Sequence, residues 1–220
     1  MVSSKKIDRI ETSIYKNCTY CSGEVCSNCR SQVARIKSYA RSNIPMDYWM
    51  LPFKNFEGDP NFKKLIVTFL SDIDKTYDDG ASLAFVGNLG TGKTYAACSI
   101  LKMALTKDYS VAYLNMSDII EKVTDNDRDF YNKITNTDFV CIDEYDARWV
   151  YPSEKAEQLF GQTMERILRE RFQNKMPTIL CSNTIELNNV LSGDFSKALD
   201  SLFSNYLKVV YVSGKDFRKL

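Results

Sequence analysis

The sequence predicts an α/β domain, in which helices cover both faces of a parallel sheet, preceded by a small cysteine-rich module. Short apolar runs alternate with amphipathic segments from residue 83 onward, and a glycine-rich loop follows the first of these runs. Such alternation is typical of parallel sheets buried on both faces. We predict the module at 1–43, a linker at 44–58 and the α/β domain at 59–220.

Length and composition fit one such domain with a small appendage. The chain has 220 residues, of which 44% are hydrophobic and 26% are charged, as in soluble globular proteins. No apolar run approaches the roughly 18 residues of a membrane span, and the polar start MVSSKKIDRIE is unlike a secretory signal. We therefore expect a protein of the cytoplasm, or of the equivalent compartment of an infected host cell, with no membrane partner.

The module contains the pattern Cys18-x2-Cys21-x4-Cys26-x2-Cys29. Two C-x-x-C hooks can supply four thiolates to a tetrahedral Zn²⁺, although the gap between the hooks is shorter than in a common zinc ribbon. The sequence has no histidine, so any metal must be held by thiolate or carboxylate. Structural zinc, an iron–sulfur cluster and unmetallated thiols remain alternatives, whereas disulfides are disfavoured in the cytosol.

The module is also basic. Residues 1–45 hold eight Lys/Arg and three Asp/Glu, a net charge of +5, which leaves −4 for the other residues. After the cysteines, basic residues recur at helical spacing: Arg30, Arg35, Lys37 and Arg41. They are suited to DNA or to an acidic protein surface, but a solvated helix face has the same composition.

The elements follow in order along the chain. Residues 43–53, NIPMDYWMLPF, predict an extended linker. Asp59 and Pro60 then predict the start of an amphipathic helix, which DDG at 78–80 ends. Strands are predicted at 83–87, 110–115, 138–143, 177–183 and 207–213. Helices are predicted at 93–107, over SDIIEKVT with Ser117 as its cap, and at 153–174 and 195–204.

The glycine loop matches G-x-x-x-x-G-K-[ST] at every fixed position, between an apolar strand and an amphipathic helix. Its backbone N–H groups can turn around a phosphate, while the helix N-terminus adds partial positive charge. Lys93 is expected to reach the β- and γ-phosphates of ATP, and Thr94 to complete the Mg²⁺ shell. The candidate nucleotide-binding residues are Gly87, Asn88, Leu89, Gly90, Thr91, Gly92, Lys93, Thr94 and Tyr95. A plain glycine turn is the alternative.

Three further residues extend this site. The apolar strand FVCID ends at Asp143, about fifty residues after Lys93, and Glu144 follows. Asp143 is predicted to support Mg²⁺ and Glu144 to activate the attacking water. Asn183, at the end of the fourth strand, would lie beside Asp143 if the third and fourth strands are neighbours. It is predicted to hold water or sense the γ-phosphate, with a turn-forming role as the alternative.

These motifs resemble a known group, the AAA+ ATPases that include the DnaC/DnaI-like helicase loaders and the IstB-like transposition ATPases. The likeness covers residues 43–220 and rests on NIPMDYW, the glycine loop, CIDE, PTILCSN and VVYVSGKDFR. It implies a five-stranded sheet in the order 5-1-4-3-2, ATP bound between self-associated subunits and no separate helical lid. It also implies that Asn183 is a sensor residue and that Arg218 senses the γ-phosphate.

One departure from the family concerns the rate of hydrolysis. The family places arginines on the helix between the fourth and fifth strands, where one reaches the neighbouring subunit's γ-phosphate. Here that helix, DFSKALDSLFSN, has no arginine, and Lys197 and Ser201 occupy the corresponding positions. Arg166, Arg169 and Arg171 on the preceding helix are alternative trans residues. Because lysine lacks the bidentate fork of arginine, we expect a slow, partner- or DNA-stimulated ATPase.

The resemblance predicts an ATP-dependent replicative helicase loader that uses ATP, Mg²⁺ and Zn²⁺. Its module would hold a hexameric replicative helicase, and its ATPase assembly would contact single-stranded DNA. The alternatives are an IstB-like regulator that binds target DNA and recruits a transposase, and a nucleotide-gated scaffold with negligible turnover.

Overall fold

The protein is represented by a computed structural model, which describes residues 3–21, 25–125, 127–145, 154–184, 187 and 194–217. The chain divides into two compact units, Met1–Leu51 and Pro52–Leu220, and the division lies inside the predicted linker. In the described part of the chain, no helix combines the length and hydropathy needed to cross a bilayer.

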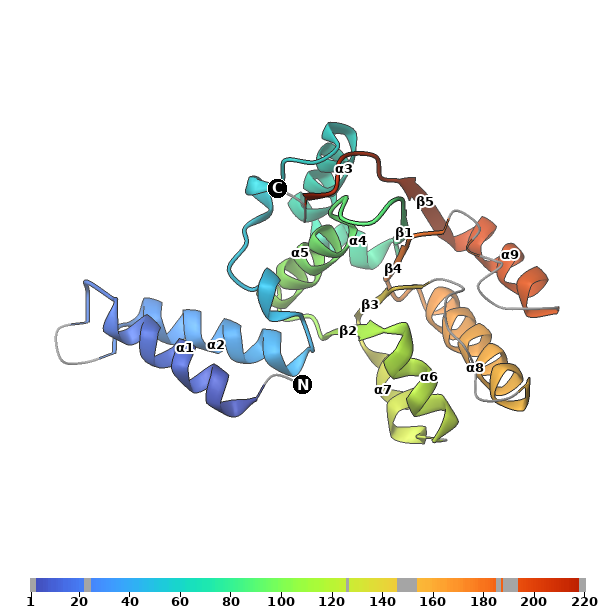
Figure 1. The fold of residues 1–220 in the computed structure, drawn as a ribbon, viewed down its shortest axis with the longest axis horizontal. Coiled ribbons are helices and arrows are strands. Elements are labelled where there is room, and N and C mark those ends of the chain that lie inside the picture. The colour runs from blue at the N-terminus through green and yellow to red at the C-terminus, as the bar shows by residue number, and fades with distance from the viewer. Residues whose placement is uncertain are drawn as a thin grey trace. The chain divides into compact units, whose positions relative to one another are not determined.

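The first unit is built on two helices, α1 (Ser4–Lys16) and α2 (Ser27–Arg41), which pack side by side (Figure 1). Val33 and Ile36 of α2 are buried, and an ion pair of 2.8 Å joins Lys37 on α2 to Glu11 on α1. A 3-10 turn, η1 (Met46–Tyr48), comes before Trp49, whose indole N–H donates to the Ile44 carbonyl at 2.7 Å. The basic residues that follow the cysteines, from Arg30 to Arg41, lie on α2.

The second unit contains a parallel sheet. Its strands are β1 (Ser82–Val86), β2 (Val111–Asn115), β3 (Phe139–Asp143), β4 (Thr178–Ser182) and β5 (Leu207–Tyr211). Among the described residues these five strands form one sheet in the order β2-β3-β4-β1-β5, and each neighbouring pair is parallel. Read from the other edge, the order is 5-1-4-3-2, which confirms the prediction.

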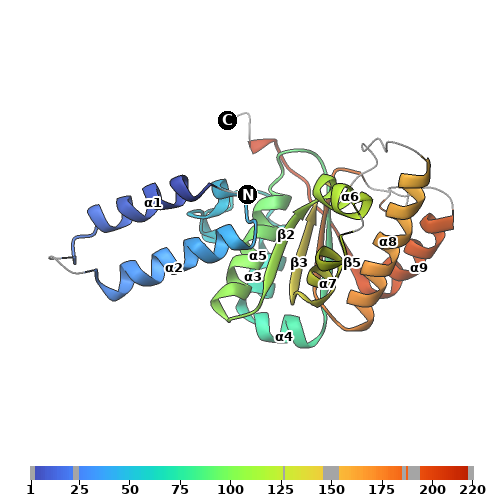
Figure 2. The same ribbon diagram turned by 90° about the horizontal axis from the view of Figure 1, so that it is seen from below.

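Helices cover both faces of the sheet (Figure 2). On one face lie α3 (Pro60–Ser71) and α5 (Lys93–Thr106), and Phe62 of α3 packs edge-on against Phe85 of β1 at 5.0 Å. The other face carries α6 (Met116–Thr124), α7 (Arg128–Asn136), α8 (Glu154–Gln173) and α9 (Asp194–Tyr206). Apolar side chains of the strands and of these four helices form one buried cluster on that face.

The helices differ from the predictions in three places. The amphipathic helix after Asp59 is interrupted at Asp72, which caps the short helix α4 (Ile73–Asp78) by accepting from the Lys75 N–H at 3.1 Å. Helix α7 was not predicted, although Asp127 caps it by accepting from the Phe130 N–H at 2.9 Å. The prediction that Ser117 caps α6 was wrong, because the helix begins at Met116, directly after β2.

Candidate nucleotide and metal sites

The glycine loop connects β1 to α5, at the edge of the sheet where the parallel strands end. Gly90 and Gly92 have left-handed φ values of 76° and 94°, which favour glycine. A Cβ at Gly90 would come within 1.7 Å of a carboxylate oxygen of Asp216, and one at Gly92 within 2.4 Å of the Phe56 ring. The loop can therefore follow this path only with glycine at both positions.

Lys93 is buried at the start of α5 and points back into the loop. Its ammonium donates to the carbonyls of Gly87 and Asn88, both at 2.7 Å, and the Thr91 hydroxyl also donates to Asn88, at 2.9 Å. A cation and the N-terminus of a 14-residue helix thus meet inside a glycine-rich turn. This combination suits the phosphates of a nucleotide. Leu89 is exposed on this loop.

Asp143 and Thr94 lie together, as expected for a Mg²⁺ site. Asp143 is buried at the end of β3, and its Oδ2 accepts from the Thr94 hydroxyl at 2.8 Å. Its Oδ1 accepts from the Glu144 N–H at 2.8 Å. A hard oxygen from each of two elements is the kind of donor that Mg²⁺ uses alongside nucleotide phosphates and water.

Sequence reasoning missed one residue at this site, Tyr113 on β2. Its hydroxyl donates to Asp143 Oδ2 at 2.6 Å, on the same oxygen that accepts from Thr94. Burial, and then the negative charge of Asp143, raise the pKa of Tyr113 well above its ordinary value, so the hydroxyl keeps its proton and donates. Tyr113 lies two residues before the end of its strand, within an apolar run that by itself indicates only packing.

Glu144 follows in a left-handed conformation, with φ of 56°, which is uncommon for a residue with a side chain. The next residue fixes this turn, because the Tyr145 N–H donates to the Cys181 carbonyl at 2.9 Å and the Tyr145 side chain is buried. Glu144 itself is exposed. Such strained residues concentrate at functional sites, where the surrounding structure holds them.

The neighbouring strand order supports the expectation for Asn183. Because β3 and β4 are adjacent, their carboxyl ends lie side by side, and Asn183 directly follows β4 and is half-buried. The sensor role of Asn183 stays a prediction.

The segments on either side of the domain both reach the glycine loop. After β5, the Val212 N–H donates to the Val86 carbonyl at 2.7 Å and the Phe217 N–H donates to Gly90 at 3.2 Å. On the N-terminal side, Phe56 packs against the loop at Gly92. Arg218, the predicted γ-phosphate sensor, lies outside the described residues.

Tyr95, predicted to bind nucleotide, belongs to an aromatic cluster beside the loop. Its ring lies 5.8 Å from Phe53 and 6.0 Å from Phe56, and its hydroxyl donates to the Pro52 carbonyl at 2.7 Å. This hydroxyl ties the start of the second unit to the first turn of α5. Burial raises the pKa of Tyr95, so the hydroxyl is protonated at neutral pH.

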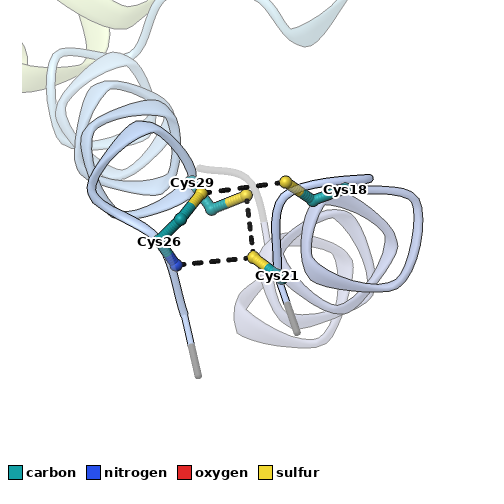
Figure 3. A group of neighbouring side chains, drawn as sticks. All are labelled: Cys18, Cys21, Cys26 and Cys29. Atoms are coloured by element: carbon teal, nitrogen blue, oxygen red, sulfur yellow. Dashed lines mark hydrogen bonds between the residues drawn. The ribbon is translucent and has the colours of Figure 1, made fainter. Parts of the chain in front are cut away.

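The four cysteines of the module gather where α1 ends and α2 begins (Figure 3). The sulfur of Cys18 lies 3.7 Å from that of Cys26, the sulfur of Cys21 lies 3.6 Å from that of Cys29, and all four sulfurs are within 4.8 Å of one another. With Zn–S bonds of about 2.3 Å, a tetrahedral site has sulfur–sulfur edges of about 3.8 Å. The cluster therefore has the size of a four-thiolate zinc site.

Hydrogen bonds already favour one thiolate in this cluster. A backbone hydrogen bond at Tyr20, and then one from Cys29, lower the pKa of Cys18 to about 7. The Cys26 N–H donates to the Cys21 sulfur at 3.4 Å. Backbone donors to the sulfurs are the kind of outer support that orients metal ligands.

The candidate trans residues on α8 and α9 lie in very different surroundings. Arg171 is fully buried and donates to the carbonyls of Ile134, Thr137, Asp138 and Pro177 and to the Thr178 hydroxyl. It is therefore a structural residue that cannot reach a neighbouring subunit. Arg169 is paired with Glu165 of the same helix, whereas Lys197 is exposed on α9.

Arg166 borders a cavity of about 430 Å³ between α7 and α8. Its guanidinium lies over the Tyr131 ring, 4.6 Å from the ring centre, and Arg128 lines the same cavity. The two arginines offer positive charge for phosphates and the ring offers a surface for stacking, while the carboxylate of Asp127 lines the same cavity.

The chain is similar to replication proteins in sequence and in fold. No family model matches the sequence. The replicative helicase loader DnaC of Escherichia coli strain K12 is 25% identical over 202 residues, which covers 82% of this chain and 78% of DnaC.

Among solved structures, DnaI superposes with a TM-score of 0.62 at 17% identity, covering 78% of this chain and 93% of DnaI. The replication initiator DnaA, bound to AMPPCP and single-stranded DNA, superposes with a TM-score of 0.58 at 18% identity, covering 78% of this chain and 51% of DnaA. The chain thus spans about half of that initiator. These likenesses confirm the AAA+ fold and the resemblance to DnaC/DnaI-like proteins.

Proposed function

From its likeness to DnaC and DnaI, we propose that this AAA+ protein is an ATP-dependent loader of a replicative helicase in DNA replication. The observation that carries the proposal is the sequence similarity to DnaC across 82% of the chain. The hydrogen bond between Thr94 and Asp143 and the path of the glycine loop support the proposal, because a nucleotide site needs both features.

Each residue of the proposed nucleotide site has a role. The glycine loop and Lys93 hold the phosphates of ATP, while Thr94 and Asp143 hold Mg²⁺, which neutralises phosphate charge when bound. Glu144 orients and deprotonates water, and Asn183 and Arg218 sense the γ-phosphate. Hydrolysis is slow, because α9 carries Lys197 and no arginine at the expected trans position.

The module holds one zinc ion through Cys18, Cys21, Cys26 and Cys29. The short distances between the sulfurs support zinc over an iron–sulfur cluster, because a cluster places irons and inorganic sulfides between the thiolates and spreads them apart. Zinc joins the end of α1 to the start of α2, so its binding energy contributes to the folding of the hairpin.

The hairpin is the part of the chain that binds the helicase in this proposal. It forms a compact unit of its own, Met1–Leu51, and several of its basic side chains face solvent. Arg35 and Arg41 are exposed, which suits an acidic surface on the partner, whereas Lys37 is already paired with Glu11.

Single-stranded DNA binds at the cavity between α7 and α8 in this proposal. Arg128 and Arg166 supply positive charge there, and Tyr131 supplies an aromatic surface. Arg166→Ala is therefore expected to weaken DNA binding and to lessen its salt dependence. Arg169→Ala is the matched control, because Arg169 is on the same helix but pairs with Glu165.

A loading assay tests the function directly. The hexameric replicative helicase of the host is incubated with closed circular single-stranded DNA, with and without this protein and ATP·Mg²⁺, and DNA-bound helicase is measured. We expect loading to increase with the wild-type chain and not with Lys93→Ala. Helicase loading that is the same with and without the protein would contradict the proposal, and transposase recruitment in its place would indicate an IstB-like regulator.

A further inference from the structure

The carboxylate of Asp143 is held from two sides by two different elements. Thr94 at the start of α5 and Tyr113 on β2 both donate to Oδ2, at 2.8 and 2.6 Å, and the Glu144 N–H donates to Oδ1. Because the donors lie on separate elements, they fix both the position and the plane of the carboxylate. A loss of either hydroxyl would leave the carboxylate less tightly fixed in this orientation.

The position of Tyr113 indicates more than packing. The residue is 7% exposed, so a phenylalanine would satisfy the hydrophobic core equally well. Its hydroxyl makes two contacts. The bond to Asp143, at the end of the neighbouring strand, is 2.6 Å long, whereas Asn115 Oδ1 on its own strand is 3.4 Å away. Hydrogen bonds to an ionised acceptor are roughly twice as strong as neutral ones.

A second tyrosine, Tyr77 on α4, makes the same kind of bond away from the nucleotide loop. The Tyr77 hydroxyl donates to Asp138 Oδ1 at 3.0 Å, and Asp138 precedes β3 while Asp143 ends it. The two tyrosine–aspartate pairs therefore lie at opposite ends of one strand. Tyr77 provides a control of matched chemistry, remote from the phosphate site.

We propose that Tyr113 is a positioning residue that holds the Asp143 carboxylate in the orientation required for Mg²⁺ at the nucleotide site. The proposal rests on the nucleotide site of the proposed function. Tyr113 need not touch nucleotide or metal, since it acts through Asp143. Partners of this outer kind commonly change metal affinity about 10- to 100-fold when they are removed.

The test measures equilibrium binding of a fluorescent ATP analogue as Mg²⁺ is titrated, and again in EDTA. Tyr113→Phe is expected to raise the half-saturating Mg²⁺ concentration about 10-fold, at the lower end of the usual range because Thr94 and the Glu144 N–H still hold the carboxylate. Its affinity in EDTA should stay within about twofold of wild type, because the glycine loop and Lys93 are unchanged. Tyr77→Phe should match wild type in both conditions.

Two results would overturn the Tyr113 proposal alone. If Tyr113→Phe and Tyr77→Phe have the same Mg²⁺ dependence, Tyr113 is only a packing residue and the nucleotide site stands. If Tyr113→Phe loses affinity equally in EDTA, its effect is on the fold and not on Asp143. An absence of Mg²⁺-dependent binding by the wild-type chain would instead contradict the nucleotide site itself, and the Tyr113 proposal with it. Thermal unfolding of both variants verifies that each is folded.

Discussion

Replacing Arg171 with leucine tests the claim that this arginine is structural. Its guanidinium is fully buried and ties α8 to the end of α7, to the start of β3 and to the start of β4. Leucine would retain the apolar packing of the stem but leave backbone carbonyls without donors inside the protein. Arg171 is nevertheless charged at neutral pH, because burial lowers its pKa only to about 9.

The expected loss follows from these bonds. Each hydrogen bond to a charged group contributes about 1.5–3 kcal/mol, but the buried charge costs several kcal/mol in lost hydration. Removing one partner of such a buried network typically costs about 3–5 kcal/mol. With a urea dependence of about 2 kcal/mol per molar, the unfolding midpoint of the second unit should fall by about 2 M.

The assay is urea unfolding followed by circular dichroism, with Arg169→Leu as the control. Arg169 lies two residues away on α8, is exposed and pairs only within its helix, so its loss should cost about 0.5 kcal/mol or less. Equal midpoints for the two variants would refute the reasoning, as would stimulation of a neighbouring subunit's hydrolysis that depends on Arg171. Arg171→Gln, which keeps two donors, should lie between Arg171→Leu and wild type.

Three further predictions concern the sites and the caps. Purified wild-type protein should contain about one zinc per chain, and Cys29→Ser should lose both the zinc and helicity of the hairpin. Cys98→Ala, which removes a buried thiol outside the cluster, should retain the zinc. Brown protein that contains iron would contradict this prediction. Glu144→Gln should bind ATP with unchanged affinity and lose turnover about 100-fold or more, so unchanged turnover would remove Glu144 from the mechanism. Asp59→Ala should destabilise the second unit by about 1 kcal/mol, because Asp59 caps α3. Hydrogen bonds from Ser213 and from the α3 backbone lower the pKa of Asp59. Its contribution to the free energy of unfolding is therefore present above about pH 4 and is lost as pH falls through the lowered pKa. A difference in stability between wild type and Asp59→Ala that persists at about pH 2 would contradict this prediction.

The sequence predicted the sheet and the nucleotide loop because both have strong local signals. Five short apolar runs and one loop with all fixed positions matched were enough to place Lys93, Thr94 and Asp143. The four cysteines were also visible from spacing alone, and the structure adds that their sulfurs are close enough for one ion.

Other features depend on contacts that no local pattern carries. Tyr113 lies in an apolar strand, and only the pairing of β2 with β3 brings its hydroxyl to Asp143. Arg171 had the sequence pattern of a charged helix face, but carbonyls from three separate segments surround it. Helix α7 was missed because its sequence, RDFYNKITN, is short and polar, with few apolar positions to reveal a period.

The measurement that tests the central claim most directly is affinity purification of the protein from its native host, with and without ATP·Mg²⁺, followed by mass spectrometry. The proposed function predicts enrichment of the hexameric replicative helicase by the wild-type chain and its loss with Cys29→Ser, which removes a zinc ligand of the helicase-binding hairpin. Enrichment of a transposase, or the absence of any enriched replicative helicase under both conditions, would contradict the account.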